Sequence, residues 1–326
     1  MAIAGTMDKV NQEILIALQK NGRYSYNKLA QKLGIKAITV AKRVETMLRD
    51  DVIAINAVPN PDILGYKVQA VICLDVEIPE LDGVCSRLVN NPNISSVSTT
   101  FGRYDLIIFA EYRDFEMLNK LVREEIANIK GIKSIETFII SDTKKRYAGV
   151  FSTNSRAERP IAVDEIDEAL ISELRTNGRA TFIALADKLD ISPATVSRRV
   201  DYLTRKKAIQ ITVVPNPTKM GRSVVAFLGL QVDLKKINEI CTRLSSFPQV
   251  PTVLTLLNGY NILTVVTEPN LQELFKFITN EIAVIRGVQN IETLIRAEFR
   301  KRTYLGFDLE ERLHHLLDDN ADLYIK

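Results

Sequence analysis

Several features are scarce in this 326-residue sequence, and each scarcity excludes a class of protein. No apolar run approaches the roughly 18 residues that span a bilayer, and residues 1–8 contain neither a basic leader nor a hydrophobic segment. A chain with 46% hydrophobic and 25% charged residues is typical of a folded globular protein. We therefore expect a cytoplasmic protein with no membrane partner, long enough for roughly two domains of about 150 residues.

Few residues are suited to metal binding or to nucleophilic catalysis. The only two histidines, His314 and His315, are neighbours in a charged tail, which excludes a histidine-based site. Isolated glycines form neither a P-loop nor a Gly-x-Gly-x-x-Gly turn, and adjacent carboxylates such as residues 50–51 are interpreted as solvated surface pairs. Three widely separated cysteines fit neither a metal site nor a disulfide framework: Cys73, Cys85 and Cys241. The sequence thus predicts no metal, no cofactor and no catalytic residue.

The most informative feature is an internal repeat with an offset of 156 residues. Asn21-Gly22-Arg23 aligns with Asn177-Gly178-Arg179, and the alignment runs without a gap to Lys145-Arg146 over Lys301-Arg302. About a third of residues 7–147 are identical to their counterparts. Because solenoid repeats have periods of roughly 20 to 50 residues, this period indicates one whole folding unit that has been duplicated.

The first part of each unit has the pattern of a helix-turn-helix domain. Apolar residues recur at helical spacing after the expected N-cap Asp8, a second short helix starts near Ser25 and stops at Gly34, and a third helix follows. In the second unit Ser192 is the expected N-cap of the third helix and Pro193 its first residue. A β-branched strand then precedes Pro-Asn-Pro in both units, which we interpret as a hairpin or wing followed by a hinge.

The remainder of each unit alternates in the order βαββαβ, which is typical of a ferredoxin-like domain. In the first unit the expected elements are residues 68–77, 81–89, 94–101, 106–112, 115–129 and 132–140. Helices cover only one face of such a sheet, so we expect the other face to associate with a second sheet, within the chain or between chains. The predicted fold class is α+β, with two copies of a winged helix-turn-helix domain followed by a ferredoxin-like domain.

These assignments divide the chain into six segments. They are helix-turn-helix domains at 1–60 and 163–216, ferredoxin-like domains at 61–147 and 217–305, a polar linker at 148–162 and a C-terminal amphipathic tail at 306–326. The tail carries leucines at helical spacing among acidic residues. Whether it packs on a sheet or on a neighbouring chain stays open.

The outer face of each third helix is basic. Opposite the expected buried valines, at 100° per residue, lie Ile38, Lys42, Glu45 and Arg49 in the first unit and Ala194, Arg198, Asp201 and Arg205 in the second. Such a face suits the major groove, because basic side chains bind guanine edges or phosphates, although helices also expose them for solubility. Residues 7–58 include nine basic and five acidic side chains, a net charge of +4, whereas residues 163–214 include eight of each. The two helical domains are therefore not expected to bind alike.

Together these features resemble the Lrp/AsnC family of transcription regulators, here as a tandem fusion. The resemblance rests on Asn21-Gly22-Arg23, Leu29-Ala30 and Thr39-Val40, and on residues 192–200, which are similar to the family's recognition helix. It implies that double-stranded DNA is the partner and that one chain supplies two unequal DNA-binding domains for an imperfect palindrome. The residues expected to bind DNA are Lys36, Thr39, Lys42, Arg43, Arg49, Ser192, Thr195, Ser197, Arg198, Arg199 and Arg205.

The same resemblance implies a small effector, usually an amino acid. Gly102-Arg103-Tyr104-Asp105 is similar to the family's Gly-x-Tyr-Asp loop, near which effectors bind between dimers. In the second unit the aligned residues are Asn258-Gly259-Tyr260-Asn261, where an amide replaces the carboxylate that could pair with an ammonium group. The expected effector residues, with one tight site per chain, are Gly102, Tyr104, Asp105, Tyr260 and Asn261. The alternative is that Gly102 only makes a tight turn and Asp105 caps it.

Two other functions stay open. The same fold resembles that of the siroheme decarboxylases, enzymes that carry paired arginines after the third helix, and histidines, to hold a polycarboxylated tetrapyrrole. The matching segments here, residues 52–56 and 208–212, contain neither a cation nor a histidine. A structural or partner-binding homologue that does not bind DNA is the other alternative.

Overall fold

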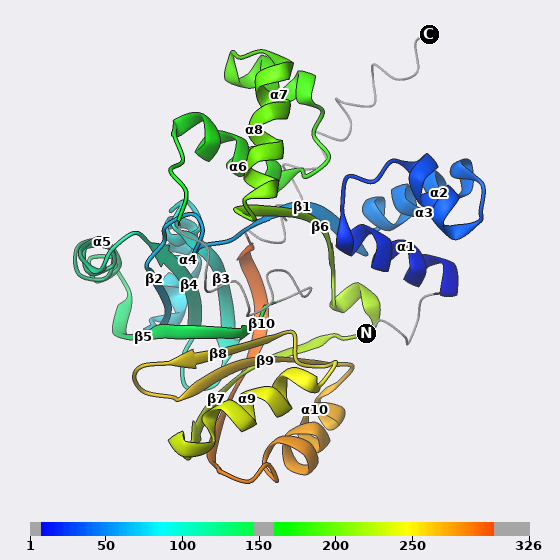
Figure 1. Cartoon of the computed structure of the whole chain (residues 1–326). Coiled ribbons are helices and arrows are strands. Elements are labelled where there is room, and N and C mark those ends of the chain that lie inside the picture. The colour runs from blue at the N-terminus through cyan, green and yellow to red at the C-terminus, as the bar shows by residue number, and fades with distance from the viewer. Residues whose placement is uncertain (1–7, 147–159, 303–326) are drawn as a thin grey trace.

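The computed structural model describes residues 8–146 and 160–302, and the two sequence repeats form two equivalent halves (Figure 1). The first half contains α1 (Lys9–Lys20), α2 (Tyr26–Leu33), α3 (Ala37–Arg49), β1 (Ile53–Pro59), β2 (Val68–Val76), α4 (Leu81–Val89), β3 (Ile94–Phe101), β4 (Leu106–Tyr112), α5 (Phe115–Lys120) and β5 (Ile132–Lys145). The second half contains α6 (Glu165–Thr176), α7 (Phe182–Leu189), α8 (Pro193–Arg205), β6 (Ile209–Pro215), β7 (Val224–Val232), α9 (Ile237–Ser246), β8 (Thr252–Leu256), β9 (Ile262–Glu268), α10 (Leu271–Phe277) and β10 (Val288–Arg302). Short 3₁₀ turns lie at Ile78–Glu80, Thr218–Met220 and Leu234–Lys236, and α5 and α10 continue as π-helical turns at Leu121–Ile126 and Ile278–Ile282.

Two of the predicted segments fall mainly or wholly outside these ranges. They are the linker at 148–162, of which residues 160–162 are described, and the tail at 306–326. None of the helices in residues 8–146 and 160–302 combines the length with the hydropathy that a membrane span requires. The same ranges contain no group of three or more His, Cys, Asp or Glu side chains arranged to hold a metal ion.

The helix-turn-helix domains, which we name head 1 (α1–α3) and head 2 (α6–α8), form where the sequence supplies helix caps. Asp8 accepts a hydrogen bond from the Asn11 amide at 2.8 Å at the start of α1, and Ser25 accepts one from the Lys28 amide at the start of α2. Gly34 ends α2 with a left-handed backbone, φ 66°. Apolar side chains of all three helices meet in one core that also includes the second head. The predicted helices and their caps are confirmed.

The strand that follows each third helix pairs with the other half. β1 and β6 form a two-stranded antiparallel sheet in which Ile53 lies opposite Pro215 and Pro59 opposite Ile209 (Figure 1). The strand that we interpreted as a hairpin or wing is present in each half, but in the described residues its pairing partner lies in the other half and does not form a hairpin within the head. Both strands are buried along nearly their whole length, so each needs a partner on its own edge, and its counterpart in the other half provides one.

The rest of each half is the predicted βαββαβ unit. Its strands lie in the orders β3-β4-β2-β5 and β8-β9-β7-β10, and all pairs are antiparallel. The two sheets join into one closed barrel, because β5 pairs with β8 and β10 pairs with β3. Helices α4 and α9 pack against the outside, and the inward faces share a core of aromatic and aliphatic side chains. The sheet faces expected to associate therefore do so within the chain.

Strand β5 is longer than predicted, since it continues from residue 140 to Lys145 along the other half. Its last residues pair with β8, from Ile140 opposite Leu256 to Lys145 opposite Val253. The Lys145 ammonium group donates hydrogen bonds to the carbonyl oxygens of Ser245 and Phe247, at the end of α9, at 2.9 and 3.0 Å. The carbonyl groups at a helix C-terminus lack partners within the helix and attract cations.

The equivalent lysine in the second half is Lys301, which donates to the carbonyl oxygen of Asn91, after the end of α4, at 2.7 Å. Burial disfavours its charged form and lowers its pKa to about 8, and burial also lowers the pKa of Lys145. Each lysine thus joins the end of one half to a helix terminus of the other.

We predict that Lys301→Met changes how stability depends on pH. Between about pH 8 and 10.5 the unfolded chain keeps the Lys301 proton and the folded chain releases it, so this residue makes the free energy of unfolding rise with pH. Because the two states differ by at most one proton, the free energy of unfolding rises by at most about 1.4 kcal/mol per pH unit. Urea unfolding at pH 8, 9 and 10 should show the wild type gaining stability relative to Lys301→Met. Parallel pH curves for the two proteins would contradict the prediction.

Candidate nucleic-acid interface

The outer faces of α3 and α8 are exposed, as the helical spacing predicts. Val40 and Val44 are fully buried, and Val196 and Val200 lie in the same core. The opposite stripes are exposed along their whole length: Ile38, Lys42, Glu45 and Arg49 on α3, and Ala194, Arg198, Asp201 and Arg205 on α8. One side of the third helix in each head, with two basic side chains on it, is therefore accessible to solvent.

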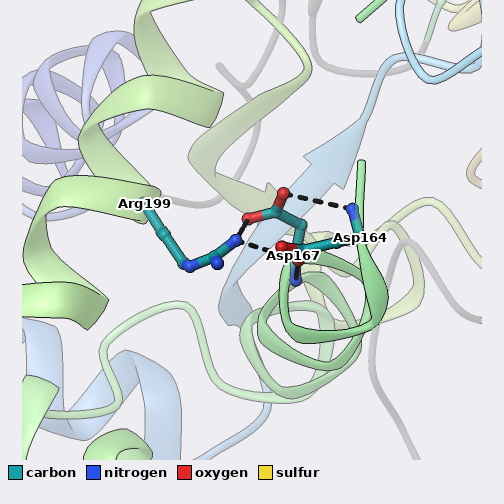
Figure 2. A network of polar contacts seen from close by, with 3 residues as sticks. All are labelled: Asp164, Asp167 and Arg199. Carbon is teal, nitrogen blue, oxygen red and sulfur yellow. Dashed lines mark hydrogen bonds and ion pairs between the residues drawn. The ribbon is translucent and has the colours of Figure 1, made fainter. Parts of the chain in front are cut away.

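Arg199 points away from this stripe. Its guanidinium group donates to Asp164 at 2.9 Å and to Asp167 at 2.8 Å, as Figure 2 shows. Asp164 and Asp167 also form a capping box at the start of α6, in which each carboxylate accepts the other residue's backbone amide. The hydrogen bond from the Asp167 amide and the nearby Arg199 guanidinium lower the pKa of the Asp164 carboxyl group. Arg199 thus connects α8 to α6 within the head.

Arg43 has the same role in head 1. It donates to Asp8 at 2.5 Å and to Asn11 at 2.9 Å, which connects α3 to the start of α1. The hydrogen bond from Arg43 lowers the pKa of the Asp8 carboxyl group. We expected both Arg43 and Arg199 to bind DNA, but their guanidinium groups are already paired inside the heads. Their sequence neighbours Lys42 and Arg198 are exposed on the outer stripe.

The hydroxyl groups expected at the interface are partly used as caps. Ser192 accepts the Thr195 amide at 3.1 Å, and the two hydroxyl groups lie 2.9 Å apart. In head 1 the equivalent cap residue is Lys36, whose side chain makes no capping hydrogen bond. Lys36 and Thr39 are exposed, whereas Ser197 is half-buried. The two heads therefore begin their third helices with different chemistry.

The heads are fixed to each other by two arginines that sequence reasoning used only as markers of the repeat. Arg23 of head 1 donates to the carbonyl oxygens of Gly178 and Ala180 in head 2, both at 3.0 Å. In return Arg179 donates to the carbonyl oxygens of Gly22 and Tyr24, both at 2.9 Å. The signal for this contact was present, because the same Asn-Gly-Arg triplet occurs in both units.

Glycines beside these arginines permit a close approach of the two halves. A Cβ atom at Gly178 would lie 2.8 Å from the carbonyl oxygen of Ile55 in β1, and one at Gly22 would lie 3.1 Å from that of Ile211 in β6. The amide groups of the two glycines donate to these same carbonyl oxygens at 2.8 Å. The turn after each first helix is thus bound to the strand of the other half.

Two polar side chains in the β1–β6 sheet cap helices across the halves. Asn56 donates to the carbonyl oxygen of Arg175 at 2.7 Å, near the end of α6, and Thr212 donates to that of Gln19 at 2.8 Å, near the end of α1. Both residues are fully buried. They lie in the segments 52–56 and 208–212, which contain neither a cation nor a histidine. In this chain these positions serve the contact between the heads.

The predicted effector loops meet the other half of the barrel. A Cβ atom at Gly102 would lie 2.6 Å from the Leu294 side chain, so the close approach that glycine permits there is made by β10. Asn258 replaces this glycine in the second half and bonds to β5, accepting the Ile139 amide at 3.0 Å and donating to the Thr137 carbonyl oxygen at 2.8 Å. The first residue of each loop therefore belongs to the joint between the halves.

Asp105 and Asn261 make the same backbone contact. A carboxylate oxygen of Asp105 accepts the Val76 amide at 2.8 Å, and the side-chain oxygen of Asn261 accepts the Val232 amide at 2.8 Å. Either side chain can act here because both supply an acceptor. The change from acid to amide removes a charge and leaves the turn intact.

The two tyrosines of these loops lie inside the barrel. The Tyr104 and Tyr260 rings flank Phe138, with centroid distances of 6.5 and 5.2 Å. The Tyr260 hydroxyl donates to Glu292, while Arg103 donates to Glu136 at 2.7 Å. Burial, together with neighbouring carboxylates, raises the pKa of both tyrosines. The tyrosines are thus packed between the halves as neutral side chains.

Comparisons with known families match both parts of both halves. A winged helix-turn-helix DNA-binding domain matches residues 7–54, and an AsnC-type helix-turn-helix domain matches residues 163–204. The Lrp/AsnC ligand binding domain matches residues 69–150, and a C-terminal dimeric alpha+beta barrel domain matches residues 226–308. The expected α+β fold, with its unit duplicated, is confirmed.

Individual relatives are similar to one half of the chain at a time. An uncharacterised HTH-type transcriptional regulator of Pyrococcus abyssi is 33% identical over 147 residues, 44% of this chain and 93% of the relative. The HTH-type transcriptional regulator FL11 of Pyrococcus furiosus is 29% identical over 142 residues, 43% of this chain and 93% of the relative.

Solved structures of one enzyme match nearly the full length of the chain. The siroheme decarboxylase NirDL covers 96% of this chain, with 100% of its own chain aligned, a TM-score of 0.65 and 16% identity. At this identity the likeness concerns the fold alone. The matched domains and the regulators together show that the chain belongs to the Lrp/AsnC family and carries the two-domain unit of that family twice.

Proposed function

We propose that this protein is a sequence-specific DNA-binding transcription regulator in which a single chain supplies both heads. The observation that carries the proposal is the exposed basic stripe on α3 and on α8, in two heads that β1 and β6 fix to each other. Family membership supports the same function. The proposed DNA contacts are Lys36, Thr39, Lys42 and Arg49 in head 1, and Ser192, Thr195, Ser197, Arg198 and Arg205 in head 2.

The two heads differ at the start of the third helix, where base contacts are made in helix-turn-helix proteins. Head 1 has Lys36-Ala37-Ile38-Thr39, and head 2 has Ser192-Pro193-Ala194-Thr195. Because the heads are fixed within one chain, both should engage one duplex, on half-sites roughly 34 to 36 Å apart. The half-sites should therefore differ in sequence.

Selection from random duplex DNA with the full-length protein tests this function. We expect one composite site, an imperfect palindrome, whose affinity falls steeply with salt, with a slope of about −0.9 in log K against log salt for each phosphate contact. Footprinting should show both half-sites protected together. Equal affinity for selected and scrambled DNA at physiological salt would refute DNA recognition, and two separate symmetric sites would refute the pairing of heads within one chain.

The neighbours Arg198 and Arg199 provide a matched pair of variants. Arg198 is exposed and makes no hydrogen bond or ion pair with another described residue, so Arg198→Ala should weaken specific DNA binding by about 1 to 3 kcal/mol and leave thermal stability unchanged. Arg199→Ala leaves the buried Asp167 carboxylate without its cation and should lower the free energy of unfolding by about 1 to 3 kcal/mol. Fluorescence anisotropy and urea unfolding measure the two effects. If instead Arg199→Ala weakened DNA binding and Arg198→Ala lowered the stability, Arg199 would be the residue that faces the DNA.

A second candidate function is that of a siroheme decarboxylase-like enzyme, which the full-length fold match favours. The residues weigh against it, since the segments that would carry the substrate-binding arginines supply Asn56 and Thr212 as buried helix caps. Titration with siroheme distinguishes the two functions. A regulator should shift a DNA band in a gel and leave the Soret absorbance of siroheme unchanged. An enzyme of the decarboxylase type should change the Soret absorbance and not bind DNA.

We further propose that the first half binds a small amino-acid effector near Asp105. Because Asn261 makes the same backbone contact as Asp105, Asp105→Asn should keep the turn folded and remove only the charge. Titration calorimetry with a panel of amino acids should find at most one tight site per chain, and Asp105→Asn should abolish it without changing the melting temperature. Asn261→Asp is the matched control and should leave that site unchanged. Undiminished binding by Asp105→Asn would exclude Asp105 as the ammonium partner.

A further inference from the structure

Ile38 stands out on the proposed DNA-binding surface. Its side chain is 77% exposed on the first turn of α3, although isoleucine is among the residues most often buried in proteins. Two residues further along the same helix, Val40 is fully buried. Packing of the head therefore does not use Ile38, and within the described residues its apolar surface faces outward.

The neighbours of Ile38 are those of a nucleic-acid contact. Lys42 and Arg49 lie on the same stripe of α3, and Lys36 and Thr39 are exposed beside it. In helix-turn-helix proteins the first residues of the third helix face the base edges, while basic groups around them bind phosphates. Ile38 is one of these first residues, and basic side chains lie around it.

An aliphatic side chain has one apolar target on the base edges of the major groove, the C5 methyl group of thymine. We infer that Ile38 reads a thymine methyl group in the half-site bound by head 1, an inference that rests on the DNA-binding function proposed above. Ala194 occupies the equivalent position on α8 and carries only a methyl group, so head 2 makes this contact weakly or not at all. The pair Ile38 and Ala194 thus determines one difference between the two half-sites.

Uracil provides the test because it lacks only the methyl group of thymine. Each thymine of the selected composite site is replaced in turn by deoxyuridine, and the dissociation constant of the full-length protein is measured at fixed salt. We expect one thymine whose replacement weakens wild-type binding roughly fourfold, which corresponds to the burial of one methyl group at about 0.8 kcal/mol. Ile38→Ala should bind thymine and uracil at that position equally.

Two further variants make the experiment decisive. Ile38→Val shortens the side chain by one carbon and should give an intermediate discrimination, which covers the case in which Ile38→Ala binds too weakly to measure. Ala194→Ile is assayed on a composite site that carries thymine at the equivalent position of the other half-site, where replacement of that thymine by deoxyuridine should weaken its binding to the same degree.

The outcomes separate the inference from the function that it rests on. If binding is specific but no thymine is sensitive to replacement, the role of Ile38 is overturned and the DNA-binding function still stands. The same holds if Ile38→Ala and Ile38→Val distinguish thymine from uracil as well as the wild type does. The absence of any selected sequence overturns both.

Discussion

Backbone pairing between the two halves is the constraint on which the rest of the molecule depends. Strand β1 has its partner in β6, and the barrel closes only because β5 reaches β8 and β10 reaches β3. A strand edge left without a partner exposes a row of unsatisfied amide and carbonyl groups and invites association with other chains. Here each half covers the edges of the other. The positions of the heads, the burial of the loop tyrosines and the caps from Asn56 and Thr212 all follow from this arrangement.

The symmetry of the backbone contrasts with the asymmetry of the side chains. In both heads an arginine connects the third helix to the first. The equivalent residues are Asp8, Asn11 and Arg43 in head 1 and Asp164, Asp167 and Arg199 in head 2. At the surface the repeat diverges, from Lys36 to Ser192 and from Ile38 to Ala194. The ion pair of Arg113 with Glu168 has no charged counterpart either, because the equivalent residues are Pro269 and Gln12. Contacts that build the heads are kept, and exposed positions have changed.

Local features of the fold could be predicted because they depend on neighbouring residues. The caps at Asp8, Ser25 and Ser192, and the boundaries of α4, β3 and β4, follow from short patterns of side chains. The partner of β1 and the extension of β5 depend on residues more than a hundred positions away. In a duplicated chain every strand also has two similar candidate partners, so a pattern within one unit cannot choose between them.

For the candidate interface, too, the sequence predicted the local features but not the contacts between distant residues. Helical spacing correctly placed Lys42 and Arg198 on the exposed face, but it did not separate them from Arg43 and Arg199, which are turned by about 100° toward the first helix. The repeated acidic residues at the start of the first helix were the available signal for that pairing. The roles of Gly102 and Asn258 could not be inferred from their loops alone, because the atoms that they contact belong to the other half.

The covalent fusion of the halves changes how the paired state responds to dilution. Two separate subunits that paired through strands equivalent to β1 and β6 would associate in a bimolecular reaction. The fraction of paired subunits would then decrease on dilution. In this chain the same contacts form intramolecularly, at an effective concentration that the connection between the halves sets. Two unlike heads therefore stay in a fixed one-to-one ratio however few copies of the protein a cell contains. Within one chain, a pair of identical heads cannot form in place of the mixed pair.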